Sequence, residues 1–203
     1  MLRRQADHWP HLFPRVARPA ARQTPMPALG RRPDSCEAAV IFVGLGANLD
    51  HPRYGAPART LDAALEALAR HGIAPVARSR RYRSAPVPAS DQPWFVNLVA
   101  AVETGLSPAA LLAALHEIEA QFGRTRHRPN EARVLDLDLL AYDDRVSAPG
   151  EVPVLPHPRL AERAFVVLPL REVAPDWRHP ESGLAIAELA RRLGPDATAE
   201  PLD

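Results

Sequence analysis

Residues 134–142 read VLDLDLLAY, and this stretch decides the fold. In a β-strand successive side chains point to opposite faces, so Asp136 and Asp138 share one face and the leucines that alternate with them share the other. A strand with one apolar face must cover a core, while its second face here carries two neighbouring carboxylates. The stretch is therefore predicted to be a half-buried strand that completes a sheet begun upstream.

Apolar patterns upstream predict three further strands and two helices. The run before Gly44 and Gly46 is continuous, which is typical of a buried strand that ends in a tight turn. Gly72 is a C-cap signal for the first helix, and Ser107 with Pro108 starts the second. In chain order the predicted elements are strand 38–43, helix 58–71, strand 74–83, a Pro-rich loop 85–93, strand 95–102, helix 108–122 and strand 134–142.

The resulting order, βαββαβ, predicts the α+β class and a ferredoxin-like antiparallel sheet with helices on one face. C-terminal strand or helix additions are expected, among them a helix-like segment near 159–165 and a short helix at 184–193. Residues 38–203 are predicted to form one domain. Residues 1–37 are predicted to be a disordered Arg/Pro-rich extension, because they show no apolar periodicity and residues 1–35 hold six of the 23 prolines.

Composition narrows the classes of function. Residues 1–35 carry seven arginines and two aspartates, whereas the whole chain has a net charge of +1, so the predicted domain is mildly acidic. A nucleic-acid-binding core would instead carry a basic stripe. No run approaches the roughly 20 apolar residues of a membrane span, and the single cysteine excludes an internal disulfide. We expect a cytoplasmic, monomeric protein that acts on small molecules, with no nucleic-acid or membrane partner.

An arginine-rich loop precedes the acidic strand. It reads GRTRHR over 123–128 and closes on Arg133. A guanidinium group binds two phosphate oxygens at once, in a bidentate manner. Mg²⁺ is commonly held by one or two carboxylates together with substrate phosphates. Such a mixture suits phosphoryl transfer, in which positioning and charge stabilisation are nearly the whole catalytic task. Taken singly, the strand could be a solvated amphipathic edge and the loop a surface feature.

Taken together, the run from Glu119 to Asp138 resembles the signature of the 6-hydroxymethyl-7,8-dihydropterin pyrophosphokinase family. Three other blocks are similar to that family in the same order: GLGANL at 44–49, the segment from Tyr82 to Asn97, and LPHPR at 155–159 continuing through Arg163, Phe165 and 169–170. The resemblance implies an enzyme of folate biosynthesis that moves pyrophosphate from ATP to the pterin hydroxymethyl group and releases AMP.

The resemblance also implies roles for individual residues. Asp136 and Asp138 would hold two Mg²⁺ ions, and Arg124 and Arg133 would close on the phosphates of the co-substrate ATP. Further nucleotide contacts would come from Glu119, Arg126, His157 and Arg163. Phe95 and Phe165 would enclose the pterin ring, whose polar edge would meet Ser84, Ala85, Val87 and Asn97.

Several alternatives stay open at this stage. Phe95 and Phe165 also suit ordinary core packing, and Asn48 suits turn geometry as well as ligand contact. Many family members have a tryptophan and a glycine before the last loop arginine, where this chain has residues 130–132, NEA. A catalytically weak paralogue that binds pterin or nucleotide is therefore a second hypothesis. An RNA-recognition module shares the βαββαβ order, but it needs aromatic side chains where this strand has aspartates.

Overall fold

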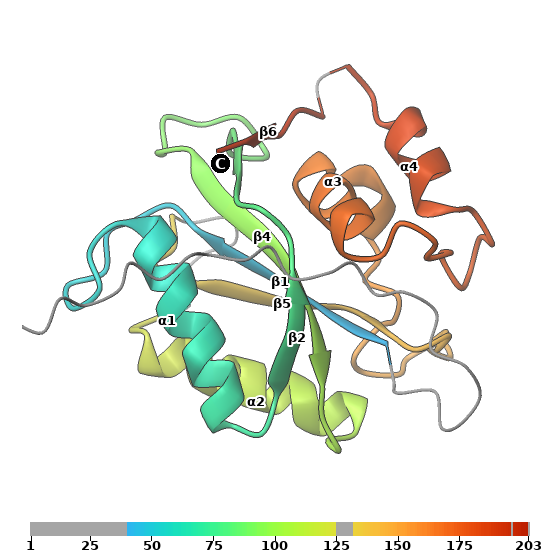
Figure 1. Cartoon of the computed structure of the whole chain (residues 1–203), viewed down its shortest axis with the longest axis horizontal. Helices are drawn as coiled ribbons and strands as arrows, with labels where there is room; N and C mark the ends of the chain where they lie inside the picture. The colour runs from blue at the N-terminus through green and yellow to red at the C-terminus, as the bar shows by residue number, and fades with distance from the viewer. Residues whose placement is uncertain (1–39, 125–131, 196, 203) are drawn as a thin grey trace, which may run out of the picture.

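Strand β1 (Ile41–Ala47) lies inside a six-stranded antiparallel sheet (Figure 1). The structure is a computed structural model, and it describes residues 40–124, 132–195 and 197–202. The strand order is β5-β1-β4-β3-β6, and β2 also pairs with β4. The remaining strands are β2 (Ala74–Arg78), β3 (Tyr82–Ser84), β4 (Phe95–Glu103), β5 (Asp136–Tyr142) and β6 (Glu200–Pro201).

Helices cover both faces of this sheet. Helices α1 (Pro57–Arg70) and α2 (Pro108–Gln121) pack on one face, where Leu137 and Leu139 of β5 join their core. The 3₁₀ helix at Leu160–Glu162, α3 (Ala164–Val173) and α4 (Ile186–Arg192) belong to the second face and its separate core. The ferredoxin-like α+β fold is thus confirmed, and the C-terminal additions prove to be a third layer on the face that the sequence left uncovered.

Strand β5 is an edge strand, and its alternation is the predicted one. Leu137 and Leu139 are buried in the α1–α2 core, and Leu140 is buried in the α3–α4 core. Asp136 and Asp138 are only partly buried and lie on the α3 face. The sheet therefore presents both carboxylates at its edge.

The prediction that the first strand ends at Gly44 and Gly46 is wrong, because β1 runs through both glycines. Their role is close approach and not a turn. A Cβ atom at Gly46 would lie 2.9 Å from Oδ1 of Asn97 on β4, and one at Gly44 would lie 3.4 Å from the Leu140 side chain. Glycine is required where a neighbouring side chain occupies the space of a Cβ atom.

Two other boundaries also differ from the predicted ones. The segment 74–83 forms two strands, separated where the Ser79 hydroxyl accepts a hydrogen bond from the Val99 amide. The helix-like segment near 159–165 is a 3₁₀ turn followed by α3, which continues to Val173 in spite of Pro169. Proline cannot donate to the carbonyl four residues earlier. The buried apolar face of α3 offsets this loss.

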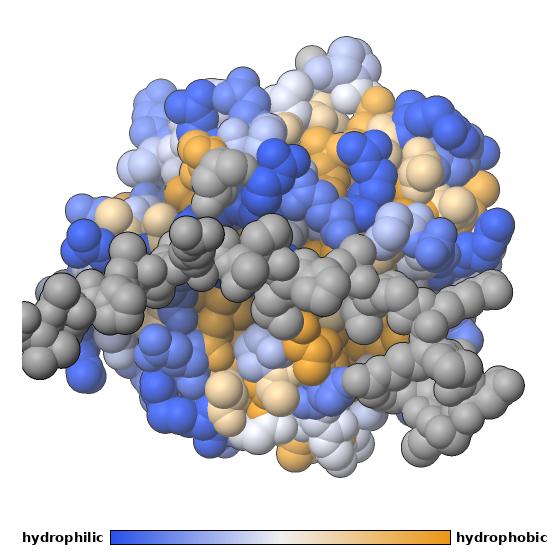
Figure 2. Space-filling model, in the orientation of Figure 1, coloured by the Kyte–Doolittle hydropathy of each residue, from blue (hydrophilic) through white to orange (hydrophobic). Residues whose placement is uncertain are grey.

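Hydrophilic residues dominate the rim of the face drawn in Figure 2, and most of the hydrophobic residues that show there lie toward its middle. Exposed large apolar side chains among the described residues include Val152, at 70% exposure, and Val154, at 54%. Both belong to the wall of the pocket described below. None of the helices in the described ranges is long and apolar enough to cross a membrane.

Glu172 on α3 joins the third layer to the sheet. It accepts hydrogen bonds from the Arg80 guanidinium at 2.6 and 2.9 Å and from the Tyr82 hydroxyl. Burial together with the bond to Glu172 raises the pKa of Tyr82 to about 12. Burial pushes the pKa of Glu172 upward, but the bonds from Arg80 and Tyr82 outweigh it, so that pKa is lowered.

We therefore expect Glu172→Gln to lower stability at pH 7 by about 1 to 2 kcal/mol. Because the folded pKa of Glu172 is lowered, its stabilising contribution is present above about pH 4.3 and is lost as the pH falls through the folded value. Urea unfolding from pH 3 to 8 would show a wild-type advantage that disappears in acid. Glu188→Gln, at a residue paired with two arginines of its own helix, is the matched control. An equal effect in the control, or a loss independent of pH, would contradict this account.

Candidate functional site

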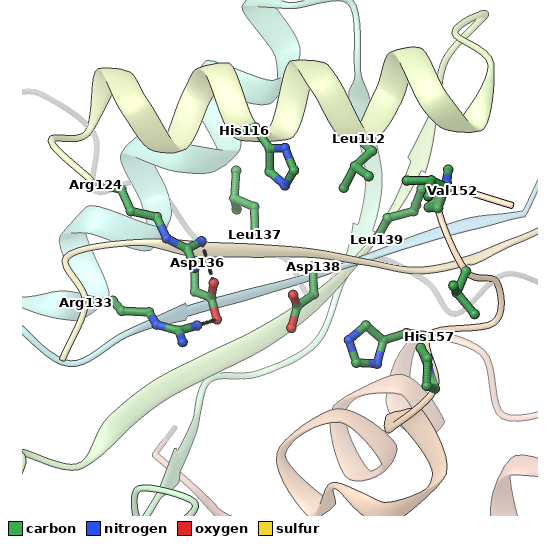
Figure 3. A pocket seen from close by; sticks show the side chains of 13 residues that line it. Leu112, His116, Arg124, Arg133, Asp136, Leu137, Asp138, Leu139, Val152 and His157 are labelled. Carbon is green, nitrogen blue, oxygen red and sulfur yellow. Dashed lines mark hydrogen bonds and ion pairs between the residues drawn. The ribbon is translucent and has the colours of Figure 1, made fainter. Parts of the chain in front are cut away.

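A pocket of about 710 Å³ lies against the open edge of β5 (Figure 3). Its walls come from α2, β5, the segment 152–158, and Arg124 and Arg133, which lie between α2 and β5 in the chain. The amide of Leu137 donates to Glu119, and the carbonyl of Leu140 accepts from the amide of His157. The lining residues are Leu112, His116, Arg124, Arg133, Asp136, Leu137, Asp138, Leu139, Val152, Pro153, Val154, His157 and Pro158.

The two aspartates lie next to each other in this pocket, with Arg124 and Arg133 beside Asp136 and His157 on the other side of Asp138 (Figure 3). Arg124 contacts Asp136 Oδ1 at 2.6 Å, and Arg133 forms an ion pair with Oδ2 of the same carboxylate. Arg163 lies 3.4 Å from Asp138. Of the arginines predicted to contact ATP, Arg124, Arg133 and Arg163 therefore converge on the acidic pair.

Glu119 on α2 holds Arg124 and β5 together. Its side chain is almost fully buried, it pairs with Arg124, and its Oε1 accepts the Leu137 amide at 2.7 Å. A buried carboxylate is stable only when it is paired and hydrogen-bonded. Glu119 therefore fixes the position of Arg124 relative to β5.

Electrostatics around Asp138 favour an additional positive charge. Burial, followed by the neighbouring Asp136 carboxylate, raises the pKa of Asp138. Burial also lowers the pKa of His157, against the opposing effect of Asp138, and lowers the pKa of Arg163. A bound cation would reverse the penalty on Asp138, because an ion is the largest local charge in such a site.

This donor set suits Mg²⁺. Two adjacent carboxylates supply hard oxygen ligands, and in the described ranges no group of three or more His, Cys, Asp or Glu side chains is placed to hold a metal. Magnesium retains several waters and typically uses one or two carboxylates plus substrate phosphates. The residues present fit a magnesium ion that is completed by a phosphate ligand.

A second, smaller pocket of about 30 Å³ lies on the α3 face of the sheet. Its lining includes Asn97, Phe165, Gly46, and again Asp136 and Asp138. The acidic pair thus lies at the boundary between the two pockets. The smaller one has room for about one or two waters, so it must widen before a bicyclic ring can enter.

Polar groups at this second pocket are connected. The Asn97 amide nitrogen donates to the Ser84 hydroxyl at 3.0 Å, and both side chains are buried. A Phe95 ring carbon lies 4.0 Å from where a Cβ atom of Gly46 would be. The Arg163 guanidinium lies 5.6 Å from the centre of the Phe165 ring. Four of the six residues predicted for the pterin therefore gather here: Ser84, Phe95, Asn97 and Phe165.

Other predicted residues are not gathered in this way. Ala85 is half-buried and Val87 is 57% exposed, and neither lines a described pocket. Arg126 and the altered loop residues 130–131 lie outside the described residues. The roles inferred for these positions stay predictions.

Two parts of the larger pocket are not predicted from the sequence. Leu112 and His116 on α2 line it four residues apart, and Glu119 follows three residues later. Residues spaced by three or four share one face of a helix, so extending the face that holds Glu119 would have found them. Val152 and Val154 gave no such signal, because their Pro-containing segment has no periodicity.

Gly46 provides a direct test of the smaller pocket. Gly46→Ala would place a methyl group 2.9 Å from Asn97 Oδ1, a contact that forces Asn97 to move. We expect pterin affinity to fall about ten-fold or more, while nucleotide affinity changes little, since displacing one hydrogen-bonding group costs about 1–3 kcal/mol. Calorimetry with each ligand would measure this. Gly183→Ala, between α3 and α4, is a control for general loss of stability. An equal loss of pterin affinity in both variants would refute the assignment.

Comparison with protein families matches residues 42–175 to the family described as 7,8-dihydro-6-hydroxymethylpterin-pyrophosphokinase (HPPK). A 2-amino-4-hydroxy-6-hydroxymethyldihydropteridine pyrophosphokinase from Methylorubrum extorquens is 45% identical over 155 residues, covering 76% of this chain and 93% of that protein. The Pseudomonas aeruginosa protein of the same name is 42% identical over 150 residues, covering 73% and 88%.

Solved structures agree on the fold. Wild-type HPPK-DHPS from Plasmodium falciparum superposes with a TM-score of 0.57 at 13% identity, covering 77% of this chain. The present chain spans 45% of that longer protein. The family match spans most of the described residues and includes Asp136 and Asp138, the two glycines of β1 and Phe165. The chain belongs to the HPPK family.

Proposed function

We propose that this protein transfers the pyrophosphoryl group of ATP to the hydroxymethyl group of 6-hydroxymethyl-7,8-dihydropterin, with release of AMP, as a step of folate synthesis. One observation carries the proposal: Asp136 and Asp138 line both pockets. Two substrates bound in the two pockets would meet at the carboxylates. The membership of the HPPK family supports the identity of both substrates.

In this proposal the larger pocket holds ATP. Its apolar wall, which includes Leu112, Val152 and Val154, suits a nucleobase. Arg124, Arg133, Arg163 and His157 would contact the phosphates or the ribose, and the resemblance adds Arg126. Arginine forks match phosphate oxygens in charge and geometry.

Asp136 and Asp138 would hold the magnesium, two ions by resemblance to the family, and these ions would supply charge neutralisation and alignment of the phosphates. Arg124 and Arg133 now contact Asp136. When phosphate and metal are bound, both guanidinium groups would exchange the carboxylate for phosphate oxygens. Glu119 would retain Arg124 nearby during that exchange.

The smaller pocket would hold the pterin. Phe165 and Phe95 supply aromatic faces, which favour a flat heteroaromatic ring. Asn97 offers one donor and one acceptor group, and Ser84 fixes the orientation of its amide. The ring would then lie with its hydroxymethyl arm toward the acidic pair, within reach of the nucleotide.

The reaction follows from this juxtaposition. The pterin hydroxyl oxygen forms a bond to the β-phosphorus, the bond from that phosphorus to the oxygen bridging to the α-phosphate breaks, and the hydroxyl proton passes to solvent. Positioning of the two substrates supplies most of the rate acceleration. Because one chain supplies both pockets, we propose that the protein acts as a monomer, and the sequence-based expectation of a cytoplasmic location is retained.

Phosphorus NMR of a mixture of the protein, ATP, Mg²⁺ and the dihydropterin tests the proposal. The expected products are AMP and a pterin diphosphate, and both should be absent when either Mg²⁺ or the pterin is omitted. ADP with a pterin monophosphate would show a different transfer. Binding of both substrates without any turnover would favour the weak paralogue instead.

A further inference from the structure

We infer that Asn48 is a positioning residue that ties the pterin half of the site to the phosphate half. The inference rests on the proposed division of the site into those halves. Asn48 follows β1 directly, it is 3% exposed, and it lines neither pocket. Its role therefore differs from both alternatives that the sequence left open, turn geometry and ligand contact.

One side of Asn48 holds the main chain of Arg133. The Arg133 amide donates to Asn48 Oδ1 at 2.6 Å. The Arg133 carbonyl accepts from the amides of Asn48 at 2.9 Å and Leu49 at 3.2 Å. Both peptide groups of Arg133 are thus bound to the end of β1, and only its side chain is left to move between Asp136 and a phosphate.

The other side of Asn48 holds the entry to β4. Its Nδ2 donates to the carbonyl of Pro93 at 3.0 Å, with a longer contact of 3.4 Å to Gln92. Pro93 lies two residues before Phe95 and four before Asn97. A shift at Pro93 would therefore pass directly into the strand that forms the pterin pocket.

The chemistry of the side chain fixes its orientation. A primary amide has one acceptor oxygen and one donor nitrogen, and Arg133 offers an N–H where Pro93 offers a carbonyl. Only one orientation satisfies both partners. Asparagine is accordingly the residue that can join this donor to this acceptor, whereas Asp repels the Pro93 carbonyl and Ala contacts neither.

Coupling of this kind acts on turnover and not on the binding of either substrate alone. Each pocket keeps its own contacts when the tie is broken, but the two reacting atoms are no longer held at a fixed separation. Misplacement by about 1 Å can cost about a hundred-fold in rate. The expected signature is a reduced kcat with nearly unchanged dissociation constants.

The test compares Asn48→Ala and Asn48→Asp with wild type. We expect kcat to fall at least about ten-fold in both, while the dissociation constants for Mg·ATP and for the pterin, measured separately, stay within about three-fold. Ser79→Ala is the matched control, since it removes another buried side chain that bridges two main-chain segments. It should lower the melting temperature with kcat within about two-fold of wild type.

Hydrogen exchange gives a readout that does not need activity. Asn48→Ala should speed amide exchange both at Arg133 and in 94–97, whereas Asn48→Asp should speed it in 94–97 and leave Arg133 protected. If the wild-type protein shows no turnover but this exchange pattern appears, the proposed function is wrong, while the link that Asn48 makes between the two segments is supported. The inference is overturned if the exchange pattern is absent. It is also overturned if Asn48→Asp keeps full kcat, if only one substrate is bound more weakly, or if Ser79→Ala loses as much kcat.

Discussion

Asp138→Asn is expected to abolish turnover and, at the same time, to raise the melting temperature of the substrate-free protein. Turnover should fall about a thousand-fold or more, because loss of a metal-binding carboxylate leaves phosphate charge uncompensated at a cost of about 4 kcal/mol. The pterin pocket is otherwise intact in the variant, so pterin binding should remain measurable.

The stability effect has the opposite sign for a separate reason. Burial and the Asp136 charge raise the pKa of Asp138, so the folded state disfavours the ionised carboxyl. A carboxyl group whose folded pKa is raised destabilises the fold once the pH is above its unfolded value. The advantage of Asp138→Asn should therefore be present at pH 7 and shrink as the pH falls toward the range in which Asp138 itself is protonated.

Asp136→Asn is the matched comparison. It should lose turnover to a similar degree, but it should not gain stability, because its carboxylate forms ion pairs with Arg124 and Arg133. Scanning calorimetry from pH 4 to 8 without Mg²⁺ or nucleotide, together with kinetics, would measure both effects. Near wild-type turnover in either variant would contradict the metal assignment, and a lower melting temperature for Asp138→Asn would contradict the electrostatic account.

Arg133→Ala is expected to lower kcat about a hundred- to a thousand-fold while weakening Mg·ATP binding much less. In the substrate-free structure this guanidinium contacts Asp136, so its transfer to phosphate loses one charged partner as it gains another. The net gain appears where negative charge develops in the transition state, and such an interaction is worth about 3–4 kcal/mol. Its main chain remains held by Asn48 and Leu49 in the variant.

Phe165→Ala should behave in the opposite way. Loss of one aromatic wall removes stacking of about 1 kcal/mol together with buried apolar area, and that contact exists in the ground state as well as the transition state. Pterin affinity should fall first, with kcat at saturation largely kept. If Arg133→Ala only raised KM, or Phe165→Ala cut kcat with affinity intact, the division of the site into two halves would be wrong.

Local patterns in the sequence predicted the structure correctly where a single element determines it. Asp136 and Asp138 share a face because strand periodicity is a property of the backbone, and Ser107 caps α2 as its side chain requires. The family resemblance, and not periodicity, predicted that Phe165 and Asn97 belong to the same site, since the two residues lie far apart in the chain.

What the sequence did not show depends on contacts between elements. The turn predicted at Gly44 and Gly46 is instead continuous strand, because the side chains that fill their Cβ space come from β4 and β5. The predicted helical segment near 159–165 ends well before α3 does, because the burial that carries α3 on to Val173 through Pro169 comes from contacts with the sheet and α4. Asn48 has no local pattern at all: its partners Pro93 and Arg133 are 45 and 85 residues away.

The open edge of β5 has a consequence for self-association. An unpaired strand edge is a template for pairing with another chain, and proteins usually protect it. Here β6 forms the opposite edge of the sheet. The β5 edge faces a pocket whose wall includes Pro153 and Pro158. Proline donates no backbone hydrogen bond, so Pro153 and Pro158 limit pairing along this wall, and at the edge the Leu137 amide and the Leu140 carbonyl are already bonded to Glu119 and His157. The edge is therefore accessible to a small ligand and poorly suited to a foreign strand, which lets the protein keep a recognition surface without creating a site for aggregation.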